Sequence, residues 1–484
     1  MKGLVRNCVL AALPLALAAC VTAVPQGLSP AIVPKTFEGA GAETRPIWPA
    51  PAWWQAFGSE ELSALIVAAQ AGNRDLAVAA ARAAEARAQT TIQRAALFPR
   101  LDLQAQGQRF GVGVAQTTGG PNPSTGISSP TSSGNSFGLA LGATYEVDVW
   151  GLARGNLRSA QEALKAARFA QQGVALTVTA NVANEYFSVL ALRKRITIAN
   201  EEISAIGAIL DSIKLKVFTG KSSHLDLAQE QAQIEAAEAE LPILKEQERE
   251  SRVALAVLLG KPPETFEVVA QDPGAIRPPP VSPGLPSDLL LHRPDVAQAE
   301  ANLAGAHANL DAARTEFLPQ LSLTGSSGYV SSALVALLHG PSFAWDIGGT
   351  LLQKVFDGGN LTGQKNLAKA TQTELLASYQ GAVLNAYADV ENALGQVMNN
   401  NNSETHLVRE VESAREAFQI AQLQYRQGAT DFITVLQAQQ TLFAAEDQLA
   451  QTTLARLQAV VHLYEALGGG WVEKAEDRTQ FASN

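Results

Sequence analysis

The sequence predicts an α+β membrane protein in which each chain contributes four strands to a shared outer-membrane β-barrel, and long helices extend that barrel into the periplasm. Three observations predict this fold. The N-terminus has the form of an export and lipidation signal. Four segments alternate apolar and polar residues over about ten positions, which is typical of barrel strands. Two proline-free stretches, residues 156–218 and 361–427, have apolar residues at helical spacing.

The composition excludes some classes of protein. The chain has 484 residues, with 36 Lys and Arg against 46 Asp and Glu, and a formal net charge of −10. Nucleic acid is not an expected partner, because phosphate binding requires clustered basic residues. Aromatic residues make up 6% and charged residues 17% of the chain. This balance favours long helices packed through small side chains over a compact enzyme.

The N-terminus predicts a lipoprotein of the outer membrane. Lys2 and Arg6 precede a short apolar stretch at residues 9–17, and a Leu-Ala-Ala sequence then leads to Cys20. This order matches the bacterial lipoprotein box, so Cys20 is expected to carry S-diacylglycerol and N-acyl groups that anchor it in outer-membrane lipid. Val21 follows where inner-membrane retention would require Asp. An ordinary secretory signal with an incidental cysteine is the alternative.

The chain contains an internal repeat. Asp75, in Asp-Leu-Ala, recurs 220 residues later as Asp295 in Asp-Val-Ala, and Gly220 recurs 208 residues later as Gly428. One difference of 12 residues, placed between the two strands of each half, explains the change of offset. The predicted organisation is a signal peptide (1–19), a lipidated N-terminal segment (20–58), a first repeat (59–272), a stiff proline-rich linker (273–286), a second repeat (287–470) and a C-terminal tail (471–484).

Each repeat contains two predicted strands, at about residues 100–110, 136–149, 320–330 and 343–356. In the second of these, odd positions such as Leu139 and Leu141 are apolar, and even positions such as Gly142 and Thr144 are small or polar. This period of two predicts a sheet with one apolar face, which lipid would cover in an outer-membrane barrel. A soluble sandwich is the alternative, but four strands leave it no obvious partner sheet.

Four strands cannot close a barrel in lipid, because open edges would leave backbone groups unpaired in hydrocarbon. Two chains would give eight strands with a filled interior, and three would give twelve with room for an aqueous lumen. The small inward-facing residues suit the wider barrel. Residues 111–134, rich in Gly, Ser, Thr and Pro, are predicted to form the exposed outer loop of the first hairpin.

Each repeat also contains a long helical hairpin, predicted at about 156–260 and 361–468. A helix over residues 156–218 would be about 95 Å long, a length that suits crossing the periplasm. A coiled coil alone would explain these helices, but it would explain neither the strand pairs nor the lipoprotein box.

The turns of the two helical hairpins are predicted at residues 219–224 and 427–432. Gly220 and Gly428 are expected to end the first helix of each hairpin with a positive φ. Asp431 is the expected N-cap of one returning helix and Ser222 of the other.

The motifs in the second repeat resemble those of the TolC family of outer-membrane efflux proteins, in its NodT-like lipoprotein branch. The resemblance covers about residues 50–470 and rests on Cys20 and on the motifs that begin at Arg293 (RPDV), Phe317 (FLPQL), Phe356 (FDGG), Tyr425 (YRQG) and Phe432 (FITVLQAQ). It implies a homotrimer with a twelve-stranded barrel above a helical barrel. It also implies two partners, a periplasmic adaptor and an inner-membrane pump of the resistance-nodulation-division (RND) type.

The resemblance further implies a periplasmic gate at the tip of the second hairpin. Tyr425 falls where the family has a gate tyrosine, and Ile433 where it has an apolar constriction, with Gly428 and Gly220 at the tips. Gln437 replaces an aspartate that members often carry, so a charged ring is not expected here. Plain helix packing is the alternative role for Tyr425 and Ile433.

The sequence contains no nucleotide-binding loop, nucleophile elbow or pair of histidines at metal-ligand spacing. We therefore expect no catalytic residue, no metal and no cofactor beyond the lipid on Cys20. The expected function is a passive exit duct for small toxic compounds or drugs in a tripartite efflux system. A duct for type I protein secretion and a periplasmic coiled-coil lipoprotein without a pore are the alternatives.

Overall fold

The computed structural model describes residue 37 and residues 48–113, 131–279, 289–338 and 342–471. The predicted signal peptide with Cys20, the outer part of the loop at 111–134, the end of the proline-rich linker and most of the C-terminal tail lie outside the described residues.

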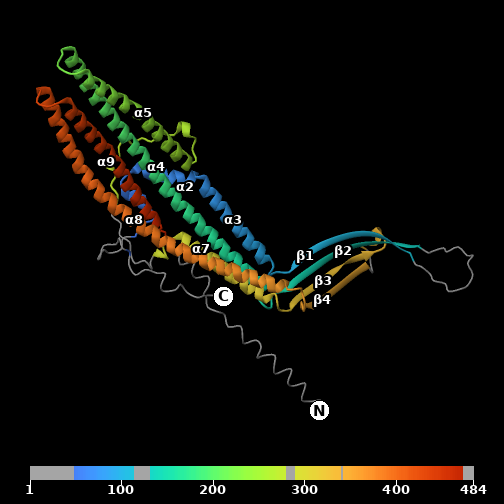
Figure 1. The fold of residues 1–484 in the computed structure, drawn as a ribbon. Coiled ribbons are helices and arrows are strands. Elements are labelled where there is room, and N and C mark those ends of the chain that lie inside the picture. Colours follow the sequence, from blue (N-terminus) through green and yellow to red (C-terminus); the bar gives the residue numbers. More distant parts are fainter. Residues whose placement is uncertain (1–36, 38–47, 114–130, 280–288, 339–341, 472–484) are drawn as a thin grey trace, which may run out of the picture.

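The described chain is an elongated bundle of helices with a four-stranded sheet at one end. Its elements are, in order, η1 (Trp53–Phe57), α2 (Glu60–Gly72), α3 (Arg74–Ala95), β1 (Arg100–Gly113), β2 (Thr131–Val147), α4 (Leu152–Phe218), α5 (His224–Leu258), η2 (Pro263–Thr265), η3 (Pro273–Ala275), α7 (Pro294–Thr315), β3 (Gln320–Ser331), η4 (Leu334–Ala336), β4 (Phe343–Leu352), α8 (Asn360–Gln427) and α9 (Phe432–Ala466). Figure 1 shows the sheet at one end and the turns of the α4–α5 and α8–α9 hairpins at the other.

The same order of elements occurs twice, as α3–β1–β2–α4–α5 and as α7–β3–β4–α8–α9. The offsets seen in the sequence also relate the two strand pairs. Arg100 pairs with Thr144 in the first pair, and Gln320 (100 + 220) pairs with Leu352 (144 + 208) in the second. The two β-hairpins therefore have the same register.

Glycines end the two long helices. Gly220 has φ of 72° and Gly428 has φ of 76°, a region that side chains with a Cβ disfavour. The amide after each glycine donates to the carbonyl five residues earlier, at 2.7 Å from Lys221 and 2.9 Å from Ala429. These bonds satisfy carbonyls in the last turn and let the chain reverse at once.

One of the two returning helices has a different N-cap residue from the one predicted. Ser223, not Ser222, caps α5: its hydroxyl accepts from the Asp226 N–H at 3.0 Å, and its own N–H donates to the Asp226 carboxylate at 3.1 Å. Asp431 is the residue before α9, but its side chain makes no capping hydrogen bond. Its carbonyl accepts from the Thr434 N–H at 3.2 Å instead. Asp431 is thus the N-cap residue of α9 as predicted, although only its backbone makes the capping contact. The prediction of Ser222 was wrong, because the extended N-cap conformation occurs at Ser223, one residue later than expected.

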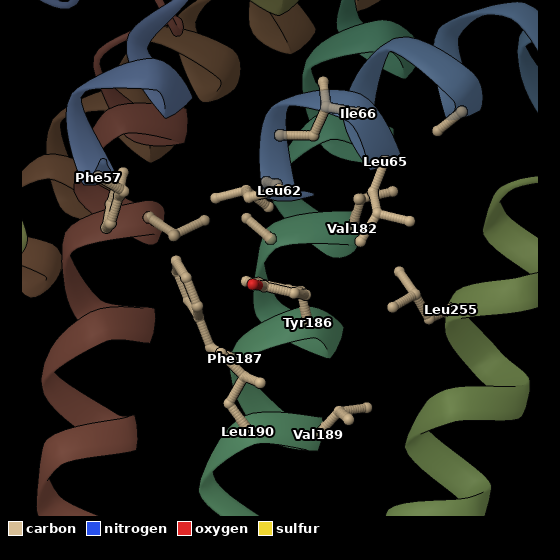
Figure 2. Packing of buried hydrophobic residues seen from close by; sticks show 14 of the residues in the cluster. Phe57, Leu62, Leu65, Ile66, Val182, Tyr186, Phe187, Val189, Leu190 and Leu255 are labelled. Atoms are coloured by element: carbon tan, nitrogen blue, oxygen red, sulfur yellow. The ribbon is translucent and has the colours of Figure 1, made fainter. Parts of the chain in front are cut away.

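The main hydrophobic core lies midway along the bundle, where η1 and α2 pack on α4 (Figure 2). The Phe57 ring lies 5.3 Å from the Phe187 ring, and both side chains are buried. Tyr186 is also buried, and its hydroxyl donates to the Glu61 carboxylate at 3.2 Å. Because the buried residues of α4 recur at helical spacing, one face of this long helix is held against the N-terminal elements.

The four strands form one antiparallel sheet in the order β1-β2-β3-β4. The central ladder joins the two halves of the chain, since β2 pairs with β3. All three ladders pair odd positions with odd positions, for example Leu141 with Leu103 and with Ser327. One face of the sheet therefore carries the odd residues of all four strands, as the alternation predicts.

Candidate functional site: the sheet faces and the hairpin tips

The odd-numbered face of the sheet is apolar and exposed in the single chain. Leu103 is 72% exposed, Trp345 68% and Ile347 82%. Ordinary water-facing sheets do not present a continuous apolar surface of this kind. The opposite face is mainly polar or small-sided and carries Asp102, Gln104, Thr144, Ser326 and Asp346. Its large apolar side chains lie near the strand ends, at Phe110, Val330 and Leu352.

In the part of the chain that the structure describes, both edges of the sheet are free. There, β1 pairs only with β2, and β4 pairs only with β3. A free edge presents a row of unpaired N–H and C=O groups, which lipid cannot satisfy. Among the described residues, no helix has the length and apolar character needed to cross a bilayer.

At the tips, the structure brings Tyr425 together with residues of two other helices. Its ring lies 5.9 Å from the Phe432 ring of α9, and the ammonium group of Lys216, in the last turn of α4, lies 3.5 Å from the centre of the Tyr425 ring. Burial raises the pKa of the Tyr425 hydroxyl. Tyr425 is thus packed between the two hairpins.

Ile433 and Gln437 lie elsewhere on the tip. Both are on the exposed side of α9, and Ile433 is 44% exposed. Gln440, one turn further along, donates to the Gln233 side chain of α5 at 2.9 Å. Tyr425 is therefore packed against other helices, whereas Ile433 and Gln437 share the exposed side of α9.

A buried acid, Glu230, lies on α5 two to three turns above its tip. Its side chain is fully buried, and neither carboxylate oxygen has a hydrogen-bond partner among the residues that the structure describes. Burial raises the pKa of Glu230 from 4.5 to about 7. Glu230, Ala237 and Leu244 are buried at intervals of seven, so the acid occupies a packing position of a coiled-coil seam.

Arg293 joins three helices at the middle of the bundle. Its guanidinium donates to Asp295 at 2.7 Å and to Asp389 of α8 at 2.9 Å, and to the Ala466 carbonyl at the end of α9 at 3.2 Å. These partners, although opposed by burial, raise the pKa of Arg293. α7 begins at Pro294 with Asp295 in its first turn, as the sequence predicts. Arg293 therefore has a structural role.

Sequence reasoning missed several residues that shape the tips. Lys216 carries no local signal, because its partners lie more than 200 positions away. Glu230 was missed because an acid in an Ala- and Gln-rich helix is usually solvated. Ser223 and Asp226 did carry a signal, a capping-box spacing of three residues. No group of His, Cys, Asp and Glu side chains able to hold a metal occurs in the described parts of the chain.

The model of the outer membrane efflux protein family matches residues 65–261 and 285–469. The pyoverdine export outer membrane protein OpmQ of Pseudomonas putida is 38% identical, over 96% of this chain and 98% of the relative. The toluene efflux pump outer membrane protein TtgI of Pseudomonas putida is 31% identical, over 86% of each. The outer-membrane channel OprN has the same fold, with a TM-score of 0.84 and 27% identity over 93% of this chain and 100% of that one.

A sheet with an apolar face and two open edges, joined to long helical hairpins, defines an outer-membrane channel subunit that extends into the periplasm. This chain belongs to the outer membrane efflux protein family, and it is the outer-membrane component of an efflux system. The identification excludes a coiled-coil lipoprotein without a pore.

Proposed function

We propose that three copies of the chain assemble into one closed channel with twelve strands and a continuous helical barrel. The observation that carries this proposal is the pair of free edges on a sheet with one apolar face. Pairing β4 of one copy with β1 of the next removes every edge and places the polar face around an aqueous lumen. The channel is a passive duct without a catalytic step or cofactor.

The repeat predicts the register of this pairing between copies. β2 pairs Ala143 with Gly325 of β3. The same offsets carry this pair to Leu351 of β4 (143 + 208) and Ala105 of β1 (325 − 220). We therefore expect Leu351 of one copy to lie opposite Ala105 of the next, both on the apolar face.

Disulfide crosslinking tests the assembly and its register together. In a chain carrying Leu351→Cys and Ala105→Cys, oxidation is expected to give a covalent trimer on denaturing gels. The matched control is Thr350→Cys with Ala105→Cys, which places the thiols on opposite faces and is expected to remain monomeric. Crosslinks that stop at dimers would exclude the closed trimer, and equal crosslinking of both pairs would exclude the register.

We further propose that the duct receives small toxic compounds or drugs from a periplasmic adaptor and an inner-membrane pump of the RND type. The relatives named for pyoverdine export and toluene efflux support this substrate class. Deleting the gene should raise sensitivity to such compounds, and purifying the intact complex should recover the pump. Recovery of a type I secretion ATPase instead would overturn this assignment.

The proposed anchor is a lipid on Cys20. Cys20→Ser should abolish acyl labelling and leave the precursor uncleaved by the lipoprotein signal peptidase. Because the barrel also holds the trimer in the membrane, a chain exported by a different signal should lose only part of its efflux.

The proposed gate lies at the periplasmic tips, with Ile433 facing the lumen and Tyr425 holding the second hairpin inward. An apolar or amide-lined constriction conducts ions poorly, because it lacks charge to offset ion desolvation. Replacing Tyr425 and Ile433 together with Ala should raise single-channel conductance in planar bilayers. A double variant that conducts like the wild type would place the constriction elsewhere.

A further inference from the structure

The ammonium group of Lys216 is one of the contacts between the two hairpins. Lys216 lies in the last turn of α4, and its Nζ is 3.5 Å from the centre of the Tyr425 ring and 3.4 Å from the Tyr425 carbonyl oxygen, to which it donates. Both contacts reach the last turn of α8. The neighbouring Lys214 is different: it is exposed and pairs with Asp211 of its own helix at 3.1 Å.

The chemistry of the contact favours a fixed cation. The ring face attracts positive charge, and the carbonyls at a helix C-terminus carry partial negative charge. No carboxylate pairs with Lys216 among the described residues, so the ring and the carbonyl are the groups that hold its head. The side chain is half-buried, which strengthens both attractions relative to an exposed lysine.

The contact is made by one hairpin only. The repeat-equivalent of Lys216 is Gln424 (216 + 208), and that of Tyr425 is Val217 (425 − 208). Neither a cation nor an aromatic ring is present at these equivalent positions. The contact therefore distinguishes the second hairpin from the first and ties one to the other.

We infer that Lys216 is a positioning residue of the gate, which holds the Tyr425 ring and the end of α8 against the first hairpin and so favours the closed tip. This inference rests on the proposed location of the gate. Loss of the charge would weaken the hold on the end of α8, where the apolar packing of Ile213 and Phe432 remains, without removing any residue of the constriction.

Planar-bilayer recording of the full-length trimer tests this role. Lys216→Met keeps the length of the side chain and removes its charge. We expect it to raise the fraction of time in conducting states about threefold or more, as loss of a partly buried cation–π contact allows. Lys216→Arg keeps the charge, so its channel should stay closed like the wild type. The matched control Lys214→Met should also conduct like the wild type. Heat dissociation of the trimer should change little.

A second set of variants approaches the contact from the other side. Tyr425→Phe keeps the ring, so its channel should stay closed, whereas the Tyr425→Leu channel should open. Adding Lys216→Met to Tyr425→Leu should not increase the conductance further.

The outcomes separate the role of Lys216 from the location of the gate. If Tyr425→Leu opens the channel and Lys216→Met does not, the inference about Lys216 is wrong while the location of the gate is supported. If neither these variants nor the Tyr425 and Ile433 double variant opens it, the gate itself is misplaced. If the Lys216→Met trimer cannot be isolated, Lys216→Arg conducting like Tyr425→Leu would also refute the inference.

Discussion

At the scale of single residues, the buried groups without partners are the most informative. Glu230 is fully buried with two unpaired oxygens, and Gln439 on α9 is also fully buried with an unpaired amide. Both occupy packing positions in otherwise apolar helix seams. A polar group in such a seam lowers stability, and in coiled coils it can also specify register.

Glu230 should make stability depend on pH. Its pKa is about 7 in the folded chain against 4.5 for an ordinary glutamate. Because the pKa is higher in the folded chain than in the unfolded chain, the protonated carboxyl contributes fully to the free energy of unfolding below pH 4.5. This contribution is lost as the pH rises through 7. Glu230→Gln should therefore match the wild type at pH 4 and be more stable at pH 8 by on the order of 3 kcal/mol per chain.

The measurement for Glu230 is the midpoint of thermal unfolding of the purified protein at both pH values. Glu246→Gln is the control, because Glu246 is exposed on the same helix. A pH-independent difference between Glu230→Gln and the wild type would show that burial does not control this carboxyl.

Arg293 should be essential for stability, because it is buried with two acidic partners on different helices. Arg293→Met leaves Asp295 and Asp389 without their cation. We expect a loss of about 1.5–3 kcal/mol, because the two carboxylates left behind are half-exposed and partly solvated. It would be measured as a lower unfolding midpoint. Arg314→Met, on the exposed side of α7, should change the midpoint by well under 1 kcal/mol.

At the scale of elements, the strand register predicts which thiols meet lipid. Cysteines at Leu139, Leu141 and Val147 should react only with membrane-soluble reagents, since these residues lie on the apolar face. Cysteines introduced on the other face should react with water-soluble reagents, at the positions Gly142, Thr144 and Glu146. If odd and even positions react alike with the two kinds of reagent, the assignment of the lipid and water faces is wrong.

At the scale of the whole molecule, the proposed threefold symmetry would triple any charge placed on the lumen. Gln437 is exposed on the same face of α9 as Ile433. Gln437→Asp should increase cation preference in bilayers, because three carboxylates would face one aperture. The control is Gln229→Asp at the equivalent position of the first hairpin, which should shift reversal potentials less. Equal shifts would mean that both hairpins line the aperture.

The sequence alone predicted the elements whose signals are local. The period of two in the strands, the proline-free helices and the glycines at 220 and 428 each reflect backbone geometry within a few residues. The repeat offsets even predict that the two β-hairpins share one register. For the candidate site, the sequence identified Tyr425, Ile433 and Gln437 only through resemblance to the family, since nothing local distinguishes them from helix-packing residues.

The tertiary structure decided what depends on contacts between distant segments. In the structure Lys216 contacts the Tyr425 ring, and Arg293 donates to Asp389. Glu230 is buried without a hydrogen-bond partner among the described residues. The structure also shows that Ser223 caps α5, where the sequence predicted Ser222. Periodicity states which side of a helix is apolar, but it does not state which other helix covers that side. Those choices are set by packing across the bundle, where side chains about 200 positions apart compete for the same space.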